Sequence, residues 1–482
     1  MTPSRYVPAT LAIALLHAHA LAQPALVDGD WSEWTIPPAA IDPVGDQTGA
    51  FDLTEVYAFV EGTRLDVAWD TGTDQSNTQS GLSRDGTVRI ELDFLDGRTL
   101  TIDLRLRLAF RETGAAVAWP DIAYETMPTV ASERYETTID LGLFLGPDEP
   151  FTLDFSGSDS LDAPITLQTN ALTPATTVRP TRRAPGTDVR IVSLNTLFGG
   201  LTQFDRRDQI ARLLDAADPD VICFQEQSTR DTTIAGILND LDPRGDGLPW
   251  NVIAFGDTAT CSPYPLTLVD FGSEHVAVEV DTGAGDTIVV FNTHPRCCGF
   301  AGSPEDQSRI AAMQEKAGQI ANIRAAQYPG IDPQAPVVVI GDWNLVGSNT
   351  PLEVLTDQAG PALADWPILN LAKPSITTWR SLSGLSFSPG RLDLVADDPS
   401  RLLRRNGYVL NTQDLDQPTL DRLGLLATDA LASDHLLMVT DYGFRPQGDV
   451  TGDSAFDAED LYALDTPILR DVLRRRELLR IR

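Results

Sequence analysis

A short apolar run in the second half of the chain, VVVIGDWN, ends in an aspartate and an asparagine two positions apart. Asp342 and Asn344 can therefore point toward the same side of a strand end, because side chains along a strand alternate with a period of two. Hydrolysis of a phosphodiester needs such groups, since a cation must neutralise the phosphate and a water must be activated. Five further segments place polar side chains beside short apolar runs: Asn195 in VRIVSLN, Glu226 in VICFQE, His294 in TIVVFNTH, Asp393 in RLDLV, and Asp434 with His435 in SDH.

Each of these segments alone also has a plain structural explanation. Asp, Asn and Ser form turns wherever strands end. The distribution of histidines favours the chemical interpretation, because only three follow residue 22, and His294 and His435 are two of them. The third, His275 in GSEHVAVEV, has no such neighbours and is interpreted as structural.

The carboxylates and amides divide into two roles. Glu226 is the best candidate for a metal ligand, since Mg²⁺ takes one or two carboxylates and keeps several waters; Mn²⁺ is the alternative ion. Asn195 belongs to the same metal site, where it either orients the carboxylate or contacts the phosphate. Asp342 would align or deprotonate the attacking water, while Asn344 donates to a phosphate oxygen.

The segment SDH supplies a group for proton transfer. We expect His435 to act as a general base or as a cation on the phosphorane, with Asp393 as its orienting carboxylate. Asp434 either ligates the metal or bonds to His435. The residue types do not decide which histidine is the acid and which is the base.

Short apolar strands alternate with amphipathic helices from about residue 188 to residue 443. RRDQIARLLDAADP and EDQSRIAAMQEKAGQIANIRAAQ have the helical period, and the apolar runs quoted above are strands. This alternation predicts an α/β domain. Open sheets in such domains present ligands at their strand ends, so we expect the six segments to converge on one cleft.

The order and spacing of the six segments resemble the endonuclease/exonuclease/phosphatase superfamily over residues 188–443. CSPYPL at residues 261–266 is similar to its SRYPI segment, and TTWRSLSGLSFSPGRLDLV is similar to its TW…PGRIDYIL segment, although Pro263 and Leu394 depart from the pattern. The resemblance implies a DNase I-like four-layer α/β sandwich and a divalent-metal-dependent phosphoric ester hydrolase. It also implies that His294 is a second catalytic histidine, which stabilises the transition state or protonates the leaving group.

The substrate stays open within that superfamily, because a fold does not fix a substrate. Nucleic acid is favoured, and sphingomyelin or inositol phosphates are alternatives. The formal net charge of −33 opposes long-range attraction of any polyanion, so local arginines or a metal ion would have to bind it. A hypothesis of another class is a non-catalytic extracellular binding or scaffold protein, which the presence of Glu226, Asp342, Asp434 and His435 disfavours.

The region before the α/β domain has a different pattern. Residues 23–170 alternate apolar and polar at a period of two, as in TVRIELDFL, which predicts an all-β sandwich domain. ALVDGDWSEW and the stretch after it resemble DOMON/CBM9-like modules, which implies contact with carbohydrate or a cell surface. Trp31 and Trp34 either stack on sugars or close the sandwich edge. Residues 171–187 are rich in Pro, Thr and Arg, and we interpret them as a linker.

Residues 1–22 have the pattern of an export signal. An apolar run is followed by small residues at Ala20 and Ala22, which is typical of a signal peptide cleaved after Ala22. We therefore expect a secreted, periplasmic or cell-surface protein. No later apolar run reaches the roughly 20 residues that a membrane span needs.

The C-terminal segment GDVTGDSAFDAEDLYAL, residues 448–464, resembles a single dockerin repeat, and the calcium loop is assigned to residues 449–465. Its acidic spacing predicts a Ca²⁺ loop, although Ser454 stands where a glycine is usual. Residues 466–482 form a basic tail with no assigned role. The expected calcium ligands are Asp449, Thr451, Asp453, Asp457 and Asp460.

The four cysteines bear on export as well. Cys223 lies in the apolar run VICFQE and is interpreted as a buried thiol. Four cysteines allow three pairings, among which we expect a disulfide from Cys261 to Cys297 or Cys298. A zinc site at the adjacent pair is disfavoured, because the pair lacks the usual spacer.

Overall fold

A computed structural model of the chain describes residues 26–45, 51–75, 88–172, 178–272, 274–283, 286–358, 363–385 and 387–445. The predicted signal peptide, the predicted calcium loop with its ligands from Asp449 to Asp460, and the basic tail lie outside the described residues. Among the helices of the described ranges, none is long and apolar enough to cross a membrane.

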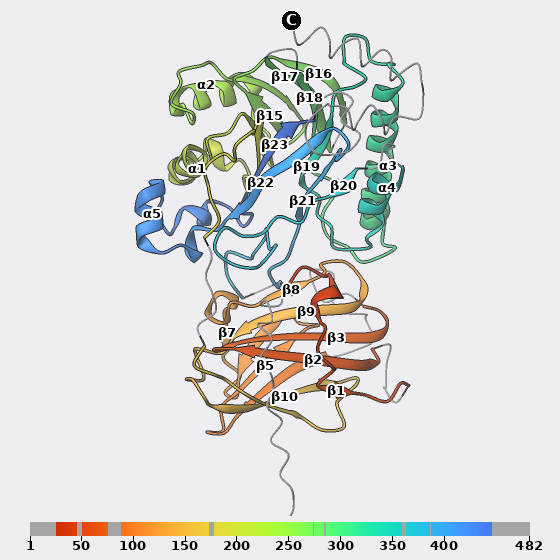
Figure 1. The fold of residues 1–482 in the computed structure, drawn as a ribbon, viewed down its shortest axis with the longest axis vertical. Coiled ribbons are helices and arrows are strands. Elements are labelled where there is room, and N and C mark those ends of the chain that lie inside the picture. The colour runs from red at the N-terminus through yellow and green to blue at the C-terminus, as the bar shows by residue number, and fades with distance from the viewer. Residues whose placement is uncertain are drawn as a thin grey trace, which may run out of the picture.

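Two antiparallel sheets form the N-terminal region, which lies below the rest of the molecule in Figure 1. Val88–Phe94 shows why they pack face to face, because alternate residues of this strand are buried and apolar. The first sheet contains, in spatial order, β1 (Ala40–Ile41), β2 (Leu53–Glu61), β3 (Arg64–Gln75), β9 (Ser132–Asp140) and β8 (Glu125–Met127). The second contains β11 (Ile165–Gln168), β10 (Pro150–Gly157), β4 (Val88–Phe94), β5 (Thr99–Asp103), β6 (Leu108–Arg111) and β7 (Ala116–Val117).

Two six-stranded sheets form the second region. The first contains β14 (Asn251–Phe255), β15 (Thr258–Ser262), β13 (Val221–Gln225), β12 (Val189–Asn195), β23 (Leu437–Phe444) and β22 (Leu402–Leu410). The other contains β16 (Leu266–Gly272), β17 (His275–Gly283), β18 (Asp286–Thr293), β19 (Val337–Asp342), β21 (Asp393–Asp397) and β20 (Ala364–Asp365). β12 runs parallel to β13, and β18 runs parallel to β19.

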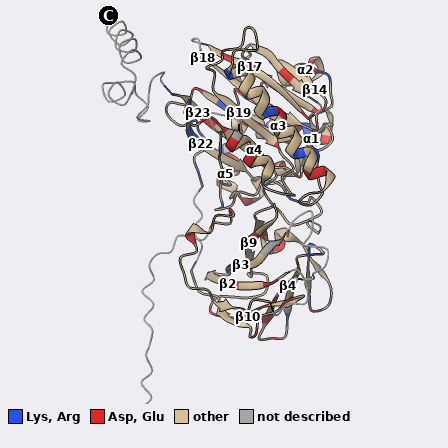
Figure 2. Cartoon of the chain, turned by 90° about the vertical axis from the view of Figure 1, so that its right-hand side faces the viewer, with Lys and Arg blue, Asp and Glu red and all other residues tan. Residues whose placement is uncertain are grey.

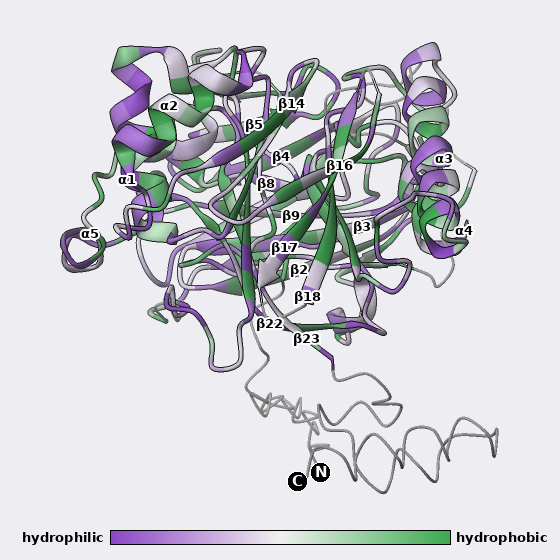
Figure 3. Ribbon diagram, turned by 90° about the horizontal axis from the view of Figure 1, so that it is seen from above, coloured by the Kyte–Doolittle hydropathy of each residue, from purple (hydrophilic) through white to green (hydrophobic). Residues whose placement is uncertain are grey.

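Helices cover the outer faces of these two sheets. Figure 3, seen from above, shows two groups of helices on opposite sides of the sheets. The first group contains α1 (Phe204–Ala217), α2 (Asp231–Leu241) and α5 (Gln417–Leu423), and the second contains α3 (Pro304–Arg324) and α4 (Thr350–Gln358). The layers are therefore helices, sheet, sheet and helices, which confirms the predicted four-layer α/β sandwich with an all-β region before it.

The central strands show why the layers form. On β19, Val338 and Ile340 enter the core between the two sheets, whereas Val337 and Val339 enter the core under α3 and α4. Both faces of the strand are buried, so the sequence is a continuous apolar run and does not alternate. Leu394, where the family pattern has a tyrosine, is buried in the same outer core.

One loop of the N-terminal region enters the α/β region. Val130 packs in the core beneath α3 and α4. The hydroxyl of Thr129 lies 2.8 Å from the carbonyl oxygen of Leu345 and 3.1 Å from that of Arg391. The two regions therefore share part of a core, and this loop contacts segments that follow Asn344 and precede Asp393.

Two smaller expectations can be compared with the structure. Trp34 is buried and donates its indole N–H to Glu136 at 2.9 Å, which is the edge-closing arrangement. Trp31 packs edge-on against Tyr57, at 5.4 Å between ring centroids. In the predicted linker, the backbone N–H of Arg179 donates to Leu371 at 2.8 Å, so its second half contacts the α/β region.

The expected disulfide is wrong, because all four cysteines are free. β15 places Cys261 opposite Ile222 of β13, inside the core between the first sheet and its helices. Cys297 and Cys298 are exposed and follow the end of β18 on a loop. The pairing of β15 with β13 thus fixes Cys261 in the interior, while Cys223 is buried as expected.

Candidate active site

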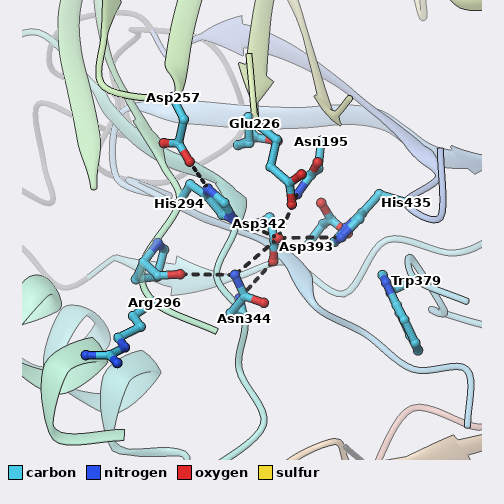
Figure 4. A network of polar contacts seen from close by, with 12 residues as sticks. Asn195, Glu226, Asp257, His294, Arg296, Asp342, Asn344, Trp379, Asp393 and His435 are labelled. Atoms are coloured by element: carbon cyan, nitrogen blue, oxygen red, sulfur yellow. Dashed lines mark hydrogen bonds and ion pairs between the residues drawn. The ribbon is translucent and has the colours of Figure 1, made fainter. Parts of the chain in front are cut away.

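A cleft of about 460 Å³ opens at the strand ends of the α/β region. Six of the predicted site residues line this cleft: Glu226, His294, Asp342, Asn344, Asp434 and His435. Two more, Asn195 and Asp393, are buried within the polar network beside it (Figure 4). The structure therefore brings the six sequence segments together at one place.

The parallel strand pairs explain this convergence. In the first sheet, the parallel strands β12 and β13 end at Asn195 and just before Glu226, and in the second the parallel strands β18 and β19 end just before His294 and at Asp342. Each pair delivers its polar residues to one edge of its own sheet. The 3.0 Å hydrogen bond from Asn195 to Asp342 shows that the two edges lie together. Gly341 lets β19 reach that edge close to β18. Its φ of 143° lies in a region that favours glycine, and a side chain there would stand 2.1 Å from the carbonyl oxygen of Thr293.

Asp342 lies at the centre of the network in Figure 4. Its Oδ1 accepts a hydrogen bond of 2.9 Å from the backbone N–H of Asn344. Its Oδ2 accepts from the side-chain amide of Asn195 at 3.0 Å and from that of Asn344 at 3.2 Å. Asp342 is 1% exposed, so these donors replace the water that would otherwise solvate its charge.

Two histidines approach the same carboxylate oxygen. The Nε2 atoms of His294 and His435 lie 3.4 and 3.5 Å from Asp342 Oδ2. Behind them, His294 Nδ1 contacts Asp257 Oδ2 at 2.8 Å, and His435 Nδ1 contacts Asp393 Oδ2 at 2.8 Å. Each imidazole is thus fixed in orientation by its own carboxylate and turns its other nitrogen toward Asp342.

The charges of this group follow from its contacts. Burial alone would raise the pKa of Asp342, but the charge of His435 and the hydrogen bond from His294 outweigh it and lower the pKa to about 2. Burial also opposes the charged form of each histidine, yet the neighbouring carboxylates raise the pKa of His435 to about 10 and that of His294 to about 11. At neutral pH Asp342 is therefore ionised between two imidazolium groups.

A sequence profile of the Endonuclease/Exonuclease/phosphatase family matches residues 192–448, more than half of the 482 residues. The chain belongs to this family. No curated protein sequence matches it.

Solved structures of low sequence identity resemble part of the chain. The human Nocturnin catalytic domain with bound sulfate is 17% identical, with a TM-score of 0.36, and the likeness covers 56% of this chain and 97% of that one. D. rerio TDP2 complexed with a single-strand DNA product is 15% identical, with a TM-score of 0.35 and coverages of 53% and 98%. A Staphylococcus aureus beta toxin mutant with bound magnesium ions is 15% identical, with a TM-score of 0.32 and coverages of 53% and 99%.

Within this family member, the surroundings of Glu226 fit a hard divalent cation. The carboxylate lines the cleft, and its two oxygens accept hydrogen bonds of 3.1 Å from the Asn195 amide and 2.8 Å from the backbone N–H of Phe198. Each carboxylate oxygen has a second lone pair for a metal, and Mg²⁺ takes such oxygens together with waters. Asn195 turns its nitrogen to Glu226, so in this arrangement it positions the carboxylate.

A second group of possible ligands overlaps the proton-transfer residues. Among the described residues, Asp342, Asp393 and His435 place ligand atoms within 4.8 Å of one another. The hydrogen bond between His435 and Asp393 already engages one imidazole nitrogen, and the raised pKa keeps His435 protonated. Asp434 lies apart from this group, because its Oδ2 accepts from the indole N–H of Trp379 at 3.1 Å. Its metal role stays a prediction.

Sequence reasoning missed two residues of the site. Asp257 lies in the turn between β14 and β15, where an aspartate after a glycine is an ordinary turn former. Trp379 was recognised only as part of the TTWR segment and was given no role in the site. Its ring lines the cleft, and its indole N–H donates to Asp434 and orients it. No sequence signal separates Asp257 from other turn aspartates.

The loop after His294 forms another part of the cleft wall. Arg309, which is fully buried, donates to the carbonyl oxygens of Arg296 at 3.0 Å and Cys298 at 2.6 Å. A hydrogen bond from Cys297 lowers the pKa of Cys298 to about 6. The loop thus presents the exposed Cys298 and Arg296 beside the predicted chemistry.

Proposed function

We propose that this chain is a divalent-metal-dependent phosphodiesterase that hydrolyses nucleic acid by in-line attack of water. The family membership supports a phosphoester hydrolase. The observation that carries the proposal further is the position of Asp342, an ionised carboxylate contacted by Asn195 and Asn344 and approached by two carboxylate-bound histidines. Phosphoryl transfer depends mainly on positioning and on charge stabilisation, and this cleft concentrates groups of both kinds.

A Mg²⁺ or Mn²⁺ ion at Glu226 would supply positive charge to the phosphate and to a bound water. Asp342 aligns the attacking water by accepting its hydrogen bond. Its lowered pKa makes it a weak base, so alignment is its main contribution. The side-chain amide of Asn344 donates hydrogen bonds to Asp342 at 3.2 Å and to the Pro295 carbonyl oxygen at 3.0 Å. In this position it can give up one of these hydrogen bonds and donate to a phosphate oxygen instead.

The histidines then act as cations and acids. His435, protonated and fixed by Asp393, donates a hydrogen bond to a phosphate oxygen whose charge grows in the transition state. His294, protonated and fixed by Asp257, donates a proton to the leaving oxygen. The general-base role for His435 is less favourable, because its raised pKa leaves it without a free acceptor nitrogen at neutral pH.

An exposed aromatic side chain beside the cleft favours nucleic acid as the substrate. A neighbouring hollow of about 530 Å³ shares Glu226, Asp257 and His294 with the cleft and extends to Phe198. Phe198 is 79% exposed, and an exposed aromatic face stacks bases without regard to sequence. Figure 2 shows acidic and basic residues interspersed over both regions, so an anionic substrate depends on local cations such as Arg296.

Export, calcium binding and carbohydrate contact belong to the proposal on the strength of sequence patterns. The signal-peptide pattern of residues 1–22 supports a secreted or periplasmic enzyme. The spacing from Asp449 to Asp460 supports a Ca²⁺ loop after the catalytic region. The resemblance of the N-terminal region to DOMON/CBM9-like modules supports contact with a glycan or a cell surface.

The test is a hydrolysis panel on the full chain. Single- and double-stranded DNA, RNA, sphingomyelin and inositol phosphates are incubated with Mg²⁺, Mn²⁺, Ca²⁺ or EDTA. The variants are Asp342→Asn and a matched control, Asp205→Asn, at an exposed position of α1. Cleavage of nucleic acid that EDTA and Asp342→Asn abolish, and that Asp205→Asn retains, is the expected result. Turnover of lipid or inositol phosphate alone would keep the hydrolase and replace nucleic acid as its substrate. No turnover of any substrate by the folded protein would contradict the proposal and favour the non-catalytic binding protein.

A further inference from the structure

Two adjacent cysteines stand on the wall of the catalytic cleft, and the proposed reaction uses neither of them. Cys297 and Cys298 are both exposed, and both line the cleft that contains Asp342. The other two cysteines, Cys223 and Cys261, are buried in the cores on either side of the first sheet of the α/β region. The accessible thiols of the chain are therefore concentrated at one place beside the site.

The backbone of the loop brings the two thiols toward each other. Side chains of neighbouring residues in an extended chain point in opposite directions. Cys298 departs from that pattern, because its φ of 71° lies in the left-handed region, which residues other than glycine rarely adopt. The two thiols hydrogen-bond to each other, and this bond lowers the pKa of the Cys298 thiol. The pair is thus a dithiol whose sulfurs already face each other.

A buried arginine holds the loop in this conformation. Arg309 of α3 is fully buried, and it donates to the carbonyl oxygens of Arg296 at 3.0 Å and Cys298 at 2.6 Å. Its guanidinium also contacts the carboxylate of Asp306 at 3.3 Å. Strained backbone persists only where its surroundings hold it. The facing thiols are therefore fixed by contacts behind the loop.

We propose that Cys297 and Cys298 are a redox-active pair that a low-molecular-weight disulfide, such as oxidised glutathione, converts reversibly into a disulfide between adjacent residues. One protein thiolate attacks a sulfur of the oxidant, which releases one small thiol and forms a mixed disulfide. The second protein thiolate then attacks the first protein sulfur and releases the other small thiol. Two protein thiols are thus oxidised, one small disulfide is reduced, and the two protons pass to the departing thiolates.

The short ring that this bond closes makes it easy to reduce. Cα atoms of adjacent residues lie about 3.8 Å apart across a trans peptide. Disulfides usually join Cα atoms roughly 4.4–6.8 Å apart, and departures from that range strain the bond. Strained disulfides are the labile and regulatory ones. The pair therefore closes where small disulfides are abundant and reopens where thiols are abundant.

Closure of the ring alters the catalytic cleft, a consequence that rests on the proposed function. The carbonyl oxygen of Pro295, two residues before Cys297, accepts the 3.0 Å hydrogen bond from the Asn344 side chain. Arg296, the exposed cation of the cleft wall, directly precedes Cys297. A disulfide at the next peptide turns the backbone that positions both groups. We expect hydrolysis by the oxidised protein to slow by about tenfold, since a misplacement of about 1 Å costs up to about 10²-fold.

The experiment treats the full chain with oxidised glutathione, with or without dithiothreitol afterwards, and identifies the products by intact mass and by peptide mapping. The expected wild-type product has lost two hydrogens in the peptide that contains Cys297 and Cys298, and dithiothreitol restores them. Cys297→Ser and Cys298→Ser are matched variants that cannot close the ring, so each should stop at a mixed disulfide with glutathione. The buried Cys223 and Cys261 are internal controls and should stay as thiols.

The mass measurement needs no turnover, so its failure differs from failure of the proposed function. Circular dichroism shows that each protein is folded. Wild-type protein that stays reduced, stops at a mixed disulfide or links two chains would overturn the redox pair. On the substrate that the hydrolysis panel identifies, oxidation should slow the wild type and leave the rate of the double variant Cys297→Ser, Cys298→Ser unchanged. Equal rates for oxidised and reduced wild type would overturn the effect on the cleft.

Discussion

The sandwich core and the catalytic cleft are both buried, but they are built from opposite kinds of side chain. Trp69, fully buried, packs on Tyr135 and Phe155 with ring centroids 5.7 Å apart in each pair. Asp342, 1% exposed, is surrounded instead by amides and imidazoles. The sandwich core is stabilised by apolar contact, which is non-directional, whereas the cleft is ordered by charges and directional hydrogen bonds.

This difference separates stability from activity. Removing atoms from the apolar core leaves a cavity and lowers the free energy of unfolding. Changing a charge in the cleft alters what the group can do to a substrate, while neighbouring partners still compensate the remaining charges. The two regions should therefore respond in opposite ways to substitutions of similar size.

The largest expected effect is on catalysis, in Asp342→Asn. We expect kcat to fall by about 10²–10³-fold, because removal of one preorganised hydrogen-bonding group at the reacting atoms costs about that much. The melting temperature should fall by less than in Trp69→Ala, because the variant loses the stabilising charge of Asp342 while His294 and His435 each retain a carboxylate of their own. Steady-state kinetics and calorimetry of the two proteins measure both quantities. A variant that unfolds but keeps its kcat would assign Asp342 a structural role.

The next effect is on stability, in Trp69→Ala. We expect the free energy of unfolding to fall by about 3–5 kcal/mol, the usual loss when a large buried aromatic side chain is removed. At a temperature where the variant is folded, its kcat should equal that of the wild type. Urea titration followed by assays of the folded fraction measures this. Loss of activity without loss of stability would show that the sandwich core acts directly on the cleft.

Much of this arrangement could be predicted from the sequence. The continuous apolar run of β19 and its polar end identify a doubly buried strand that delivers Asp342 to a cleft, and the same reasoning places Asn195 at the end of β12. Asp257 could not be predicted, because its partner His294 is 37 residues away and nothing local distinguishes it from a turn residue.

Two other features could not be predicted from the sequence, for physical reasons. The disulfide to Cys261 was expected because cysteines in exported proteins usually pair, but strand pairing places this thiol in a core that the exposed Cys297 does not enter. The contact of Thr129 with Leu345 joins residues 216 positions apart. Such long-range contacts depend on how two separately patterned regions pack, which periodicity within either one does not determine.

Thr129 tests whether the two regions are energetically coupled. Thr129→Val keeps the shape but removes the hydroxyl, leaving two buried carbonyl oxygens, those of Leu345 and Arg391, with one donor fewer. We expect a loss of about 1–3 kcal/mol in stability. We also expect kcat to fall by about threefold to tenfold with little change in KM, because the contacted segments adjoin Asn344 and Asp393. Thr129→Ser should restore both values. A stability loss without any change in kcat would confine Thr129 to packing.

The pH dependence of stability distinguishes the two regions without substrate. The raised pKa of His435 stabilises the folded chain fully below the ordinary imidazole pKa of 6.5, and this contribution is lost as pH rises toward about 10. The lowered pKa of Asp342 stabilises it above 3.8, and this contribution is lost as pH falls toward about 2. In urea titrations with EDTA, the stability difference between wild type and His435→Gln should therefore shrink from pH 6 to pH 10. The corresponding difference for Trp69→Ala should stay constant, because no titrating group is involved. A pH-independent difference for His435→Gln would mean that the imidazole is neutral in the folded chain and available as a base.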